Sequence, residues 1–590
     1  MGNPFLSARF VPLILLAGTF LSAGCSDSDY DFGNIDSTVG LGGNMLELPA
    51  SSTENIKLHD VLELEANGCV VETANGDYVF RQQGGQVAAA HPLIDKIVVK
   101  EESRPEIIPV EVRLKVSDVR AGMRRSSAAV AEASGNIFEF HYHGDKPDEV
   151  KELTEAEMTG NVTLTLKFPS RLNSLVPYLQ NLVLRLPEYM GAEDRGSSQT
   201  PVVAANVLSF SNVPTSRDLV VKINIKTLDF TKTDAVPGNS ISQQGSSVKL
   251  NGFVGMTASG AVTGAPTGGS QDLGHITGVF ESSQFTINVA TGRFSPSITL
   301  DNLGDVMISG VPDFLKEGNV VADLYNPQIS LDVSNDMQVS GIASGVITAV
   351  KDGRTTASVA VDGIRLEGGK TSHVCICRRA DGVEGYDQVI VKDNLSELVK
   401  TIPDRITFTA SATADDRQKG RLELGHSYTV QPSYSVDAPI AFAENAVIEY
   451  RDTLDGWHDD IKRLKLADDA YIQATANVEN RVPAYLSLNV IPVDAGKKPV
   501  DGIAVQLVKS RVEASADGLQ PATSPLEVRL LQTADDALER LDGLVMVVTG
   551  KADSGEGNSV TGITLNAQTH TLRLTGLKIK VVGKIIGEFN

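Results

Sequence analysis

Short runs in which apolar and polar residues alternate dominate the chain beyond about residue 70. Residues 111–116 (EVRLKV) and 162–168 (VTLTLKF) each place their apolar side chains on one face of a strand. Because a strand with one buried and one wet face produces this period of two, the pattern predicts antiparallel sheets. The same period recurs at 219–225, 284–289, 329–333, 355–361 and 572–582.

A hairpin is predicted at residues 70–81 (VVETANGDYVFR), where two β-rich runs flank Asn75 and Gly76. Both turn positions of an Asn-Gly hairpin accept a positive φ. Helical signals are few and short, and they fall at 148–158, 394–401 and 533–542. We therefore expect a mainly β fold, with several antiparallel β-sandwich or long curved-sheet modules and a few short helices.

A weak internal repeat places a proline between apolar residues at the end of a strand-like or helical segment. Since proline has no amide to donate inside a sheet, we expect each copy to form a strand-exit corner, which suggests reused sheet modules. The copies are 186–190 (LPEYM), 311–315 (VPDFL), 402–406 (IPDRI) and 482–486 (VPAYL).

Polar, glycine- or serine-rich stretches and a charged segment at 414–420 mark candidate boundaries between domains. At about 100–200 residues per domain, the chain is long enough for three or four domains. We predict a signal peptide at 1–24, a lipidated acidic tether at 25–47, and β domains at 48–215, 216–410 and 411–590.

The N-terminus has the features of a secretory signal peptide. Arg9 precedes an apolar run at 10–21, which is shorter than the roughly 20 residues that a transmembrane helix needs. The small residues 22–24 follow, and Cys25 comes next.

This arrangement around Cys25 resembles the lipobox of bacterial lipoproteins, although Ser22 stands where that family usually has leucine. In that family the cysteine is lipidated and becomes the new N-terminus. The acidic segment that follows resembles the surface-export tether of Bacteroidetes lipoproteins, whereas an ordinary solvated linker is the alternative. The resemblance implies a lipid anchor in the outer membrane and exposure at the cell surface. The tether residues are Ser26, Asp27, Ser28, Asp29 and Asp31.

Composition excludes some function classes. The formal net charge of −22 repels polyanions, so a nucleic-acid partner is not expected. Aromatic residues make up only 5% of the chain, which counts against aromatic platforms for sugar rings. Beyond Cys25 there are three cysteines, too few for a disulfide framework, so core burial must stabilise the chain.

Candidate chemistry is sparse. His373, Cys375 and Cys377 share one face of a strand, but such neighbours lie about 6.5–7 Å apart, which is too spread for one zinc ion. We therefore interpret the two thiols as buried on a core-facing strand, and expect no metal. His141 and His143 have the same geometry, and we expect an exposed or edge-strand pair there.

The sequence contains no complete catalytic motif. Residues 363–371 (GIRLEGGKT) lack the spacing and the following helix of a phosphate loop. We predict no catalytic residue, no cofactor and no enzymatic activity. Residues 455–460 (DGWHDD) contain the single tryptophan, and Trp457 with His458 forms a candidate recognition tip, with an ordinary turn as the alternative.

Residues 323–335 (DLYNPQISLDVSN) and 475–490 (TANVENRVPAYLSLNV) resemble a pattern of uncharacterised Bacteroidetes lipoproteins. These two stretches also resemble the water-stress and late-embryogenesis β-sandwiches and lipid-binding tubular proteins. Neither resemblance brings a catalytic residue with it.

Three hypotheses follow. The first is a non-enzymatic, lipid-anchored surface protein for adhesion, assembly or capture of a protein, glycan or lipid. The second is a lipid-binding or lipid-transfer protein with an apolar groove between curved sheets. The third, a hydrolase with a dispersed site, ranks last because no local motif supports it. Apolar rows around an open space would favour the second hypothesis, and a closed sandwich would argue against it.

Overall fold

The computed structural model describes residues 40–41, 45–47, 52–62, 64, 68–84, 87–121, 124–263, 272–300, 305–309, 311, 320–461 and 470–583. Within these ranges the chain is mainly β, as predicted, with antiparallel sheets and a few short helices. The predicted signal peptide, Cys25 and the tether residues Ser26, Asp27, Ser28, Asp29 and Asp31 lie outside them.

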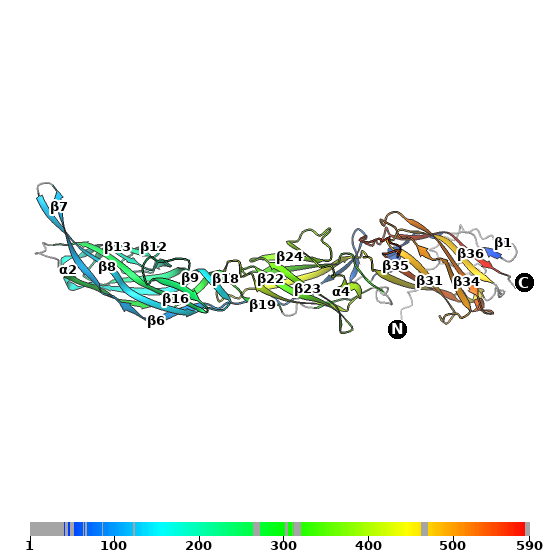
Figure 1. The fold of residues 1–590 in the computed structure, drawn as a ribbon, viewed down its shortest axis with the longest axis horizontal. Coiled ribbons are helices and arrows are strands. Elements are labelled where there is room, and N and C mark those ends of the chain that lie inside the picture. Colours follow the sequence, from blue (N-terminus) through cyan, green and yellow to red (C-terminus); the bar gives the residue numbers. More distant parts are fainter. Residues whose placement is uncertain are drawn as a thin grey trace.

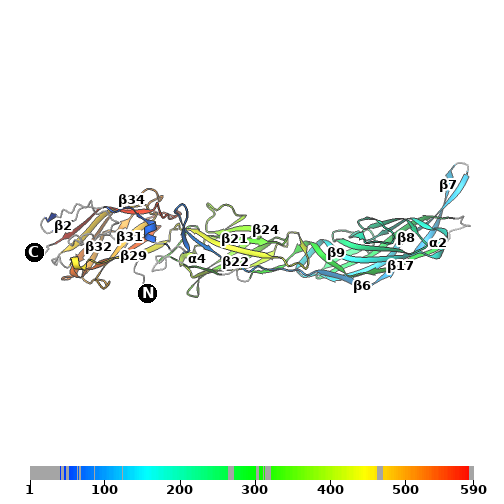
Figure 2. The ribbon, with the colours of Figure 1, turned by 180° about the vertical axis from the view of Figure 1, so that it is seen from behind.

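Three modules lie end to end in a rod (Figure 1; Figure 2). The hairpin module occupies one end, and its long hairpin of β7 and β8 extends beyond the rest of the module. Its sheet joins fourteen described strands, and α2 (Ser170–Leu175) accompanies it. The strands are β6 (Ile97–Ile107), β7 (Val110–Ala121), β8 (Arg124–Asp145), β9 (Val150–Lys167), β10 (Tyr178–Arg185), β11 (Met190–Asp194), β12 (Val202–Ala204), β13 (Val207–Pro214), β14 (Leu219–Asp229), β15 (Ser240–Gln244), β16 (Ser247–Ala261), β17 (Asp272–Ser282), β18 (Phe285–Phe294) and β27 (Gly420–Glu423).

The middle module packs two sheets against each other and carries α4 (Glu397–Lys400). One sheet contains β4 (Val70–Glu72), β5 (Tyr78–Gln83), β21 (Gln328–Asn335), β24 (Lys370–Cys377), β25 (Gln388–Val391) and β28 (Val430–Pro439). The other contains β19 (Ser297–Leu300), β20 (Asp305–Met307), β22 (Gly341–Lys351), β23 (Arg354–Leu366) and β26 (Arg405–Ala414).

The terminal module holds the first and the last described strands of the chain, together with α1 (Leu58–Leu62), α5 (His458–Ile461) and the 3-10 helix η3 (Leu538–Arg540). One sheet contains β1 (Gly40–Leu41), β2 (Met45–Glu47), β3 (Ile56–Lys57), β30 (Tyr471–Asn480), β32 (Ile503–Lys509), β34 (Ala522–Gln532) and β36 (Thr571–Val582). The other contains β29 (Val447–Leu454), β31 (Tyr485–Val493), β33 (Arg511–Val512) and β35 (Gly543–Lys551).

The chain runs from the terminal module through the middle module to the hairpin module and then returns. Its first strands join the terminal module, β4 and β5 join the middle module, and the segment 97–294 builds the hairpin module before the chain comes back. The predicted divisions at 215 and 410 therefore do not coincide with the sheets. Strand β14 pairs with β9 across the first division, and β26 contains the second.

The middle and terminal modules share one strand connectivity. In the middle module β21 pairs with β24 and β28, while β22 pairs with β23 and β26. In the terminal module β30 pairs with β34 and β36, while β31 pairs with β33 and β35. An early strand completes each module, β5 against β28 and β2 against β36. The rod therefore contains a duplicated unit, consistent with the predicted reuse of sheet modules.

A buried asparagine occupies the same place in both copies. Asn335 lies in the stretch 323–335 and Asn480 in the stretch 475–490, the two stretches that resemble one pattern in the sequence. In the terminal module Asn480 accepts a hydrogen bond from the Val482 amide at 2.8 Å, and its Nδ2 donates to the carbonyls of Ala484 at 3.0 Å and Glu513 at 2.9 Å. The Glu513 amide donates to Ser524 Oγ at 2.8 Å.

The middle module repeats this arrangement. Asn335 accepts from the Met337 amide at 3.1 Å and donates to the carbonyls of Val339 at 3.0 Å and Glu367 at 3.2 Å. Ser372 Oγ accepts from the Glu367 amide at 2.9 Å. Because buried backbone groups need partners, each asparagine fixes the exit of a central strand.

Two helix predictions need correction. Residues 148–158 belong largely to β9, not to a helix. Leu153 and Thr154 are buried in succession, and the register against β18 shifts between Glu155 and Leu153. This bulge interrupts the period of two and spaces Val150, Leu153 and Ala156 three apart, as in a helix.

At 533–542 only the 3-10 helix η3 forms, because Asp536 adopts a φ of 55° and interrupts the helical turn. The helix predicted at 394–401 is present as the shorter α4. The predicted hairpin is confirmed, with β4 paired to β5 and Gly76 at a φ of 84°.

We predict that Asn480→Ala destabilises the protein. The substitution leaves one amide and two carbonyls at the exit of β30 without their partner, so the free energy of unfolding is expected to fall by about 2–3 kcal/mol. Chemical denaturation measures this change, and the exposed Asn558→Ala serves as the control. Equal effects of the two substitutions would contradict the anchoring role of Asn480.

Candidate functional site

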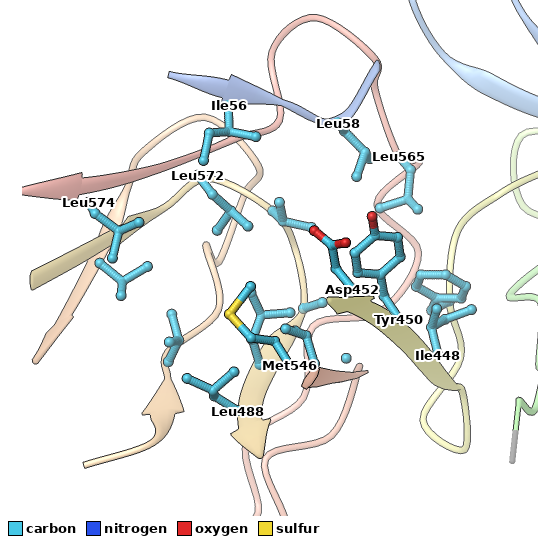
Figure 3. A pocket seen from close by; sticks show the side chains of 18 of the residues that line it. Ile56, Leu58, Ile448, Tyr450, Asp452, Leu488, Met546, Leu565, Leu572 and Leu574 are labelled. Atoms are coloured by element: carbon cyan, nitrogen blue, oxygen red, sulfur yellow. The ribbon is translucent and has the colours of Figure 1, made fainter. Parts of the chain in front are cut away.

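An apolar cavity of about 240 Å³ lies between the two sheets of the terminal module (Figure 3). Its walls come from inward-facing positions of β29, β30, β31, β34, β35 and β36. The lining residues are Ile56, Leu58, Val70, Tyr78, Ile440, Phe442, Ile448, Tyr450, Asp452, Val478, Val482, Ala484, Leu486, Leu488, Val512, Leu526, Met546, Val548, Gly550, Leu565, Leu572 and Leu574. The cavity therefore takes the place of part of the sandwich core.

The wall combines segments that are far apart in the sequence. The N-terminal strap, residues 52–62, contributes Ile56 and Leu58 and pairs with β36 through Ile56 and Leu572. The β4–β5 hairpin contributes Val70 and Tyr78. Several wall residues, including Leu488, are only half-buried, so the inner faces are not closed against each other.

The duplicated middle module shows what the same architecture looks like when it is filled. The corresponding space between its sheets is only about 10 Å³, roughly the room that one water needs. Phe408 and Tyr434 are among the residues that line it. A closed sandwich is thus compatible with this connectivity, and the open space is particular to the terminal module.

Three side chains of the otherwise apolar wall carry polar atoms: Tyr78, Tyr450 and Asp452. Asp452 follows Ile448 and Tyr450 at alternate positions of β29, so all three face inward (Figure 3). Within the described part of the chain, Asp452 Oδ2 is buried without a hydrogen-bond partner, and so is the hydroxyl of Tyr78.

Burial changes the titration of both groups. It raises the pKa of the Asp452 carboxyl above its ordinary value, and nearby Asp455 adds to this shift, whereas the Thr453 amide opposes it. Burial likewise raises the pKa of the Tyr78 phenol, with smaller contributions from Glu72 and Asp60. Tyr78 thus faces the cavity as a neutral hydroxyl, which both donates and accepts hydrogen bonds.

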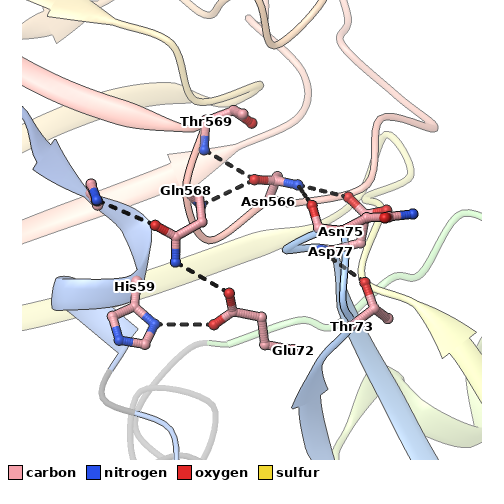
Figure 4. A network of polar contacts seen from close by, with 9 residues as sticks. His59, Glu72, Thr73, Asn75, Asp77, Asn566, Gln568 and Thr569 are labelled. Carbon is pink, nitrogen blue, oxygen red and sulfur yellow. Dashed lines mark hydrogen bonds and ion pairs between the residues drawn. The ribbon is translucent and has the colours of Figure 1, made fainter.

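A polar network ties the strap and the β4–β5 hairpin to the loop before β36 (Figure 4). Glu72 Oε2 pairs with His59 Nδ1 at 3.1 Å, and its Oε1 accepts from Gln568 Nε2 at 3.2 Å. Lys57 Nζ donates to Gln568 Oε1 at 3.3 Å. The strap is thus linked both to the middle module and to the C-terminal strands.

Asn566 connects the turn of the hairpin to the same loop. Its Nδ2 donates to the Asn75 carbonyl at 3.0 Å and to Asp77 Oδ1 at 2.9 Å (Figure 4). The Asn566 amide donates to Nδ1 of the buried His570 at 3.0 Å. These bonds hold Leu565 and Tyr78 against the cavity, since the Tyr78 amide donates to the Leu565 carbonyl at 2.8 Å.

The candidate recognition tip is only partly exposed. Trp457 and His458 are half-buried at the start of α5, and Trp457 packs against the core of the terminal module. The Trp457 amide donates to the Asp542 carbonyl at 2.8 Å, and the His458 amide donates to Asp542 Oδ1 at 3.0 Å. Neither residue lines the cavity, and their recognition role stays a prediction.

The other sequence candidates lie in the remaining modules. Cys375 and Cys377 are buried free thiols, as interpreted, and burial raises the pKa of Cys375 to about 12. His373 on the same strand is exposed and pairs with Asp332 Oδ1 at 2.8 Å.

His141 is half-buried and its Nδ1 contacts Asn251 Oδ1 at 2.9 Å, while His143 lies 3.7 Å from Asp145. Within the described residues no cluster of three His, Cys, Asp or Glu could hold a metal ion. No helix in the described ranges has the length and apolar character that a membrane crossing requires.

Sequence reasoning offered an apolar groove between curved sheets as an alternative but did not identify the residues that line the cavity. The available signal was Asp452, a charged residue at an inward position of the alternating segment 448–454 (IEYRDTL). An acidic residue on a core-facing row is unusual unless it is paired or faces a site.

Comparisons with known proteins give only distant likenesses. No family model matches the chain, and no curated protein matches it. Among solved structures, a "putative secreted protein" of Parabacteroides distasonis is 17% identical over 50% of this chain and 83% of its own, with a TM-score of 0.35. A structure of infectious bursal disease virus (Gx strain) is 10% identical over 85% of this chain and 84% of its own, with a TM-score of 0.15. These scores are too low for any argument to rest on them.

We predict that acid weakens the joint that His570 supports. Burial lowers the pKa of His570 below its ordinary 6.5, while the charge of Asp77 opposes this shift. The neutral ring can accept the Asn566 amide at Nδ1 in the folded state. The unfolded state therefore binds the proton more readily, and the free energy of unfolding should fall as pH drops from about 6.5 toward the lowered folded value.

Denaturation series between pH 7.5 and 5 measure this slope (roughly the interval over which histidine titrates). His570→Gln should flatten the slope, whereas the exposed His426→Gln should keep it. An unchanged slope in the His570 variant would show that other groups cause it.

Proposed function

We propose that the protein is a non-enzymatic lipoprotein, anchored in the outer membrane through Cys25, that displays a rod of β modules at the cell surface for binding or assembly. The rod geometry carries this proposal. The described strands nearest to Cys25, β1 and β2, lie in the terminal module, and the β7–β8 hairpin lies at the opposite end (Figure 1).

This arrangement suits a tethered rod. The fifteen peptide units between Cys25 and Gly40 reach at most about 50 Å when extended, so the terminal module would stay next to the membrane. The hairpin module would then project away from it. The acidic residues after Cys25 and the net charge of −22 oppose close contact with anionic lipid, so acyl chains would provide the attachment.

Localisation of wild type and variants tests the anchor. Wild type should carry acyl chains on Cys25 and be cleaved by protease added to intact cells, whereas Cys25→Ala should lose the acyl chains and leave the membrane fraction. Asp27→Ala/Asp29→Ala/Asp31→Ala should keep the acyl chains and lose cleavage on intact cells. An acylated wild type that resists the protease would place the protein on the periplasmic side and contradict surface display.

The cavity favours a second function, binding of an apolar ligand between the sheets of the terminal module. Ligand sites are typically concave, mostly apolar and equipped with few polar groups, and this cavity has all three features. An engineered apolar cavity of about 150 Å³ already binds benzene, so 240 Å³ accommodates a larger molecule.

Filling the cavity tests this second function. Leu488→Trp places a larger side chain in the wall and should abolish binding of a fluorescent apolar probe, such as an anilinonaphthalene dye, with little loss of stability. Leu519→Trp, at a side chain that is 65% exposed, is the matched control. Equal probe binding by both variants would argue against the cavity as the site.

A further inference from the structure

The polar groups in the cavity wall restrict the ligand that it accepts, an inference that rests on the second proposed function. Tyr78 is fully buried, and its hydroxyl has no hydrogen-bond partner in the described structure. Asp452 Oδ2 is buried and equally without a described partner. Buried polar atoms are normally paired, so the unpaired oxygen of Asp452, an acid in the wall of an apolar space, points to a bound group that pairs with it.

The wall also has a definite charge character. None of the lining residues is lysine, arginine or histidine, and Asp452 is the one carboxylic acid among them. A ligand with a carboxylate or phosphate head would find no cation there and would face a like charge. A head that donates hydrogen bonds would satisfy Asp452.

The remainder of the wall suits a hydrocarbon chain. Leucine, isoleucine, valine and methionine side chains from both sheets and from the strap surround the space (Figure 3). Burial of a chain there removes apolar surface from water on both partners. Figure 3 shows Leu488 and Met546 on the other side of the space from Ile56 and Leu58, so a chain would contact the sandwich and the strap together.

We propose that the cavity binds a single-chain amphiphile whose head donates hydrogen bonds and carries no negative charge, with Asp452 receiving the head. A long-chain amine suits the site best, because its ammonium group both donates to Asp452 and balances its charge. An uncharged alcohol follows, and a fatty-acid carboxylate is rejected.

Three probes of equal chain length separate these heads: decylamine, 1-decanol and decanoate. Displacement of the fluorescent apolar probe from the purified full-length protein at pH 7.5 gives the three dissociation constants, and native mass spectrometry gives the stoichiometry. Decylamine should bind roughly 10- to 100-fold more tightly than decanoate, the range of a charge-assisted hydrogen bond, and with a stoichiometry of one.

A variant assigns the preference to Asp452. Asp452→Asn keeps the shape of the side chain, removes its charge, and should reduce the ratio between decylamine and decanoate to within a few-fold. Asp501→Asn, at an exposed acid of the same module, should leave all three constants unchanged and thereby excludes attraction of the amine to the acidic surface.

The outcomes separate the ligand class from the site itself. If all three probes bind equally and Asp452→Asn changes nothing, the cavity binds apolar ligands but the proposed head preference is wrong. If no probe binds wild type, or if Leu488→Trp binds all three as wild type does, the cavity is not the site and both proposals fail.

Discussion

Antiparallel pairing between the two ends of the chain is the constraint on which the rest of the structure depends. Strands β2 and β3 add to β36, and β5 adds to β28. Each of these two modules therefore closes only when a segment from the start of the chain pairs with a strand far along it, β36 near the end for the terminal module and β28 for the middle module. Because such contacts are distant in sequence, much loop entropy must be lost before they form, and folding of the terminal and middle modules is coupled.

The duplicated unit provides a reference against which the cavity can be interpreted. Two units with the same connectivity differ in their cores: the middle unit is filled and the terminal unit is hollow. On the scale of about 24 cal/mol per Å³ measured for closed cavities, a hollow of 240 Å³ would cost roughly 6 kcal/mol. That cost is comparable with the whole net stability of many domains. A hollow of this size is more readily understood as a site than as imperfect packing, especially when the related unit fills the same space.

Local patterns predicted the fold class but not the arrangement of the modules. The alternating runs at 162–168 and 572–582 became strands because each has one buried face, and Asn75-Gly76 formed its hairpin turn because glycine adopts positive φ there. The segment 148–158 misled because a bulge at Thr154 imitates helical spacing. The predicted domain divisions do not follow the sheets, since no local signal reveals that β5 pairs with a strand beyond residue 430.

The candidate site was harder to predict than the fold, since its walls come from distant segments. Only Asp452 carried a local signal, and its significance depends on Tyr78 and on the strap, both far away in the sequence.

The strap also relates the two proposed functions physically. Residues 52–62 follow the predicted tether and form one side of the cavity through Ile56 and Leu58. A ligand that contacts these side chains adds apolar burial to the few backbone bonds that hold the strap on β36. Occupancy of the cavity and attachment of the strap to β36 would therefore stabilise each other, because both depend on the same short segment.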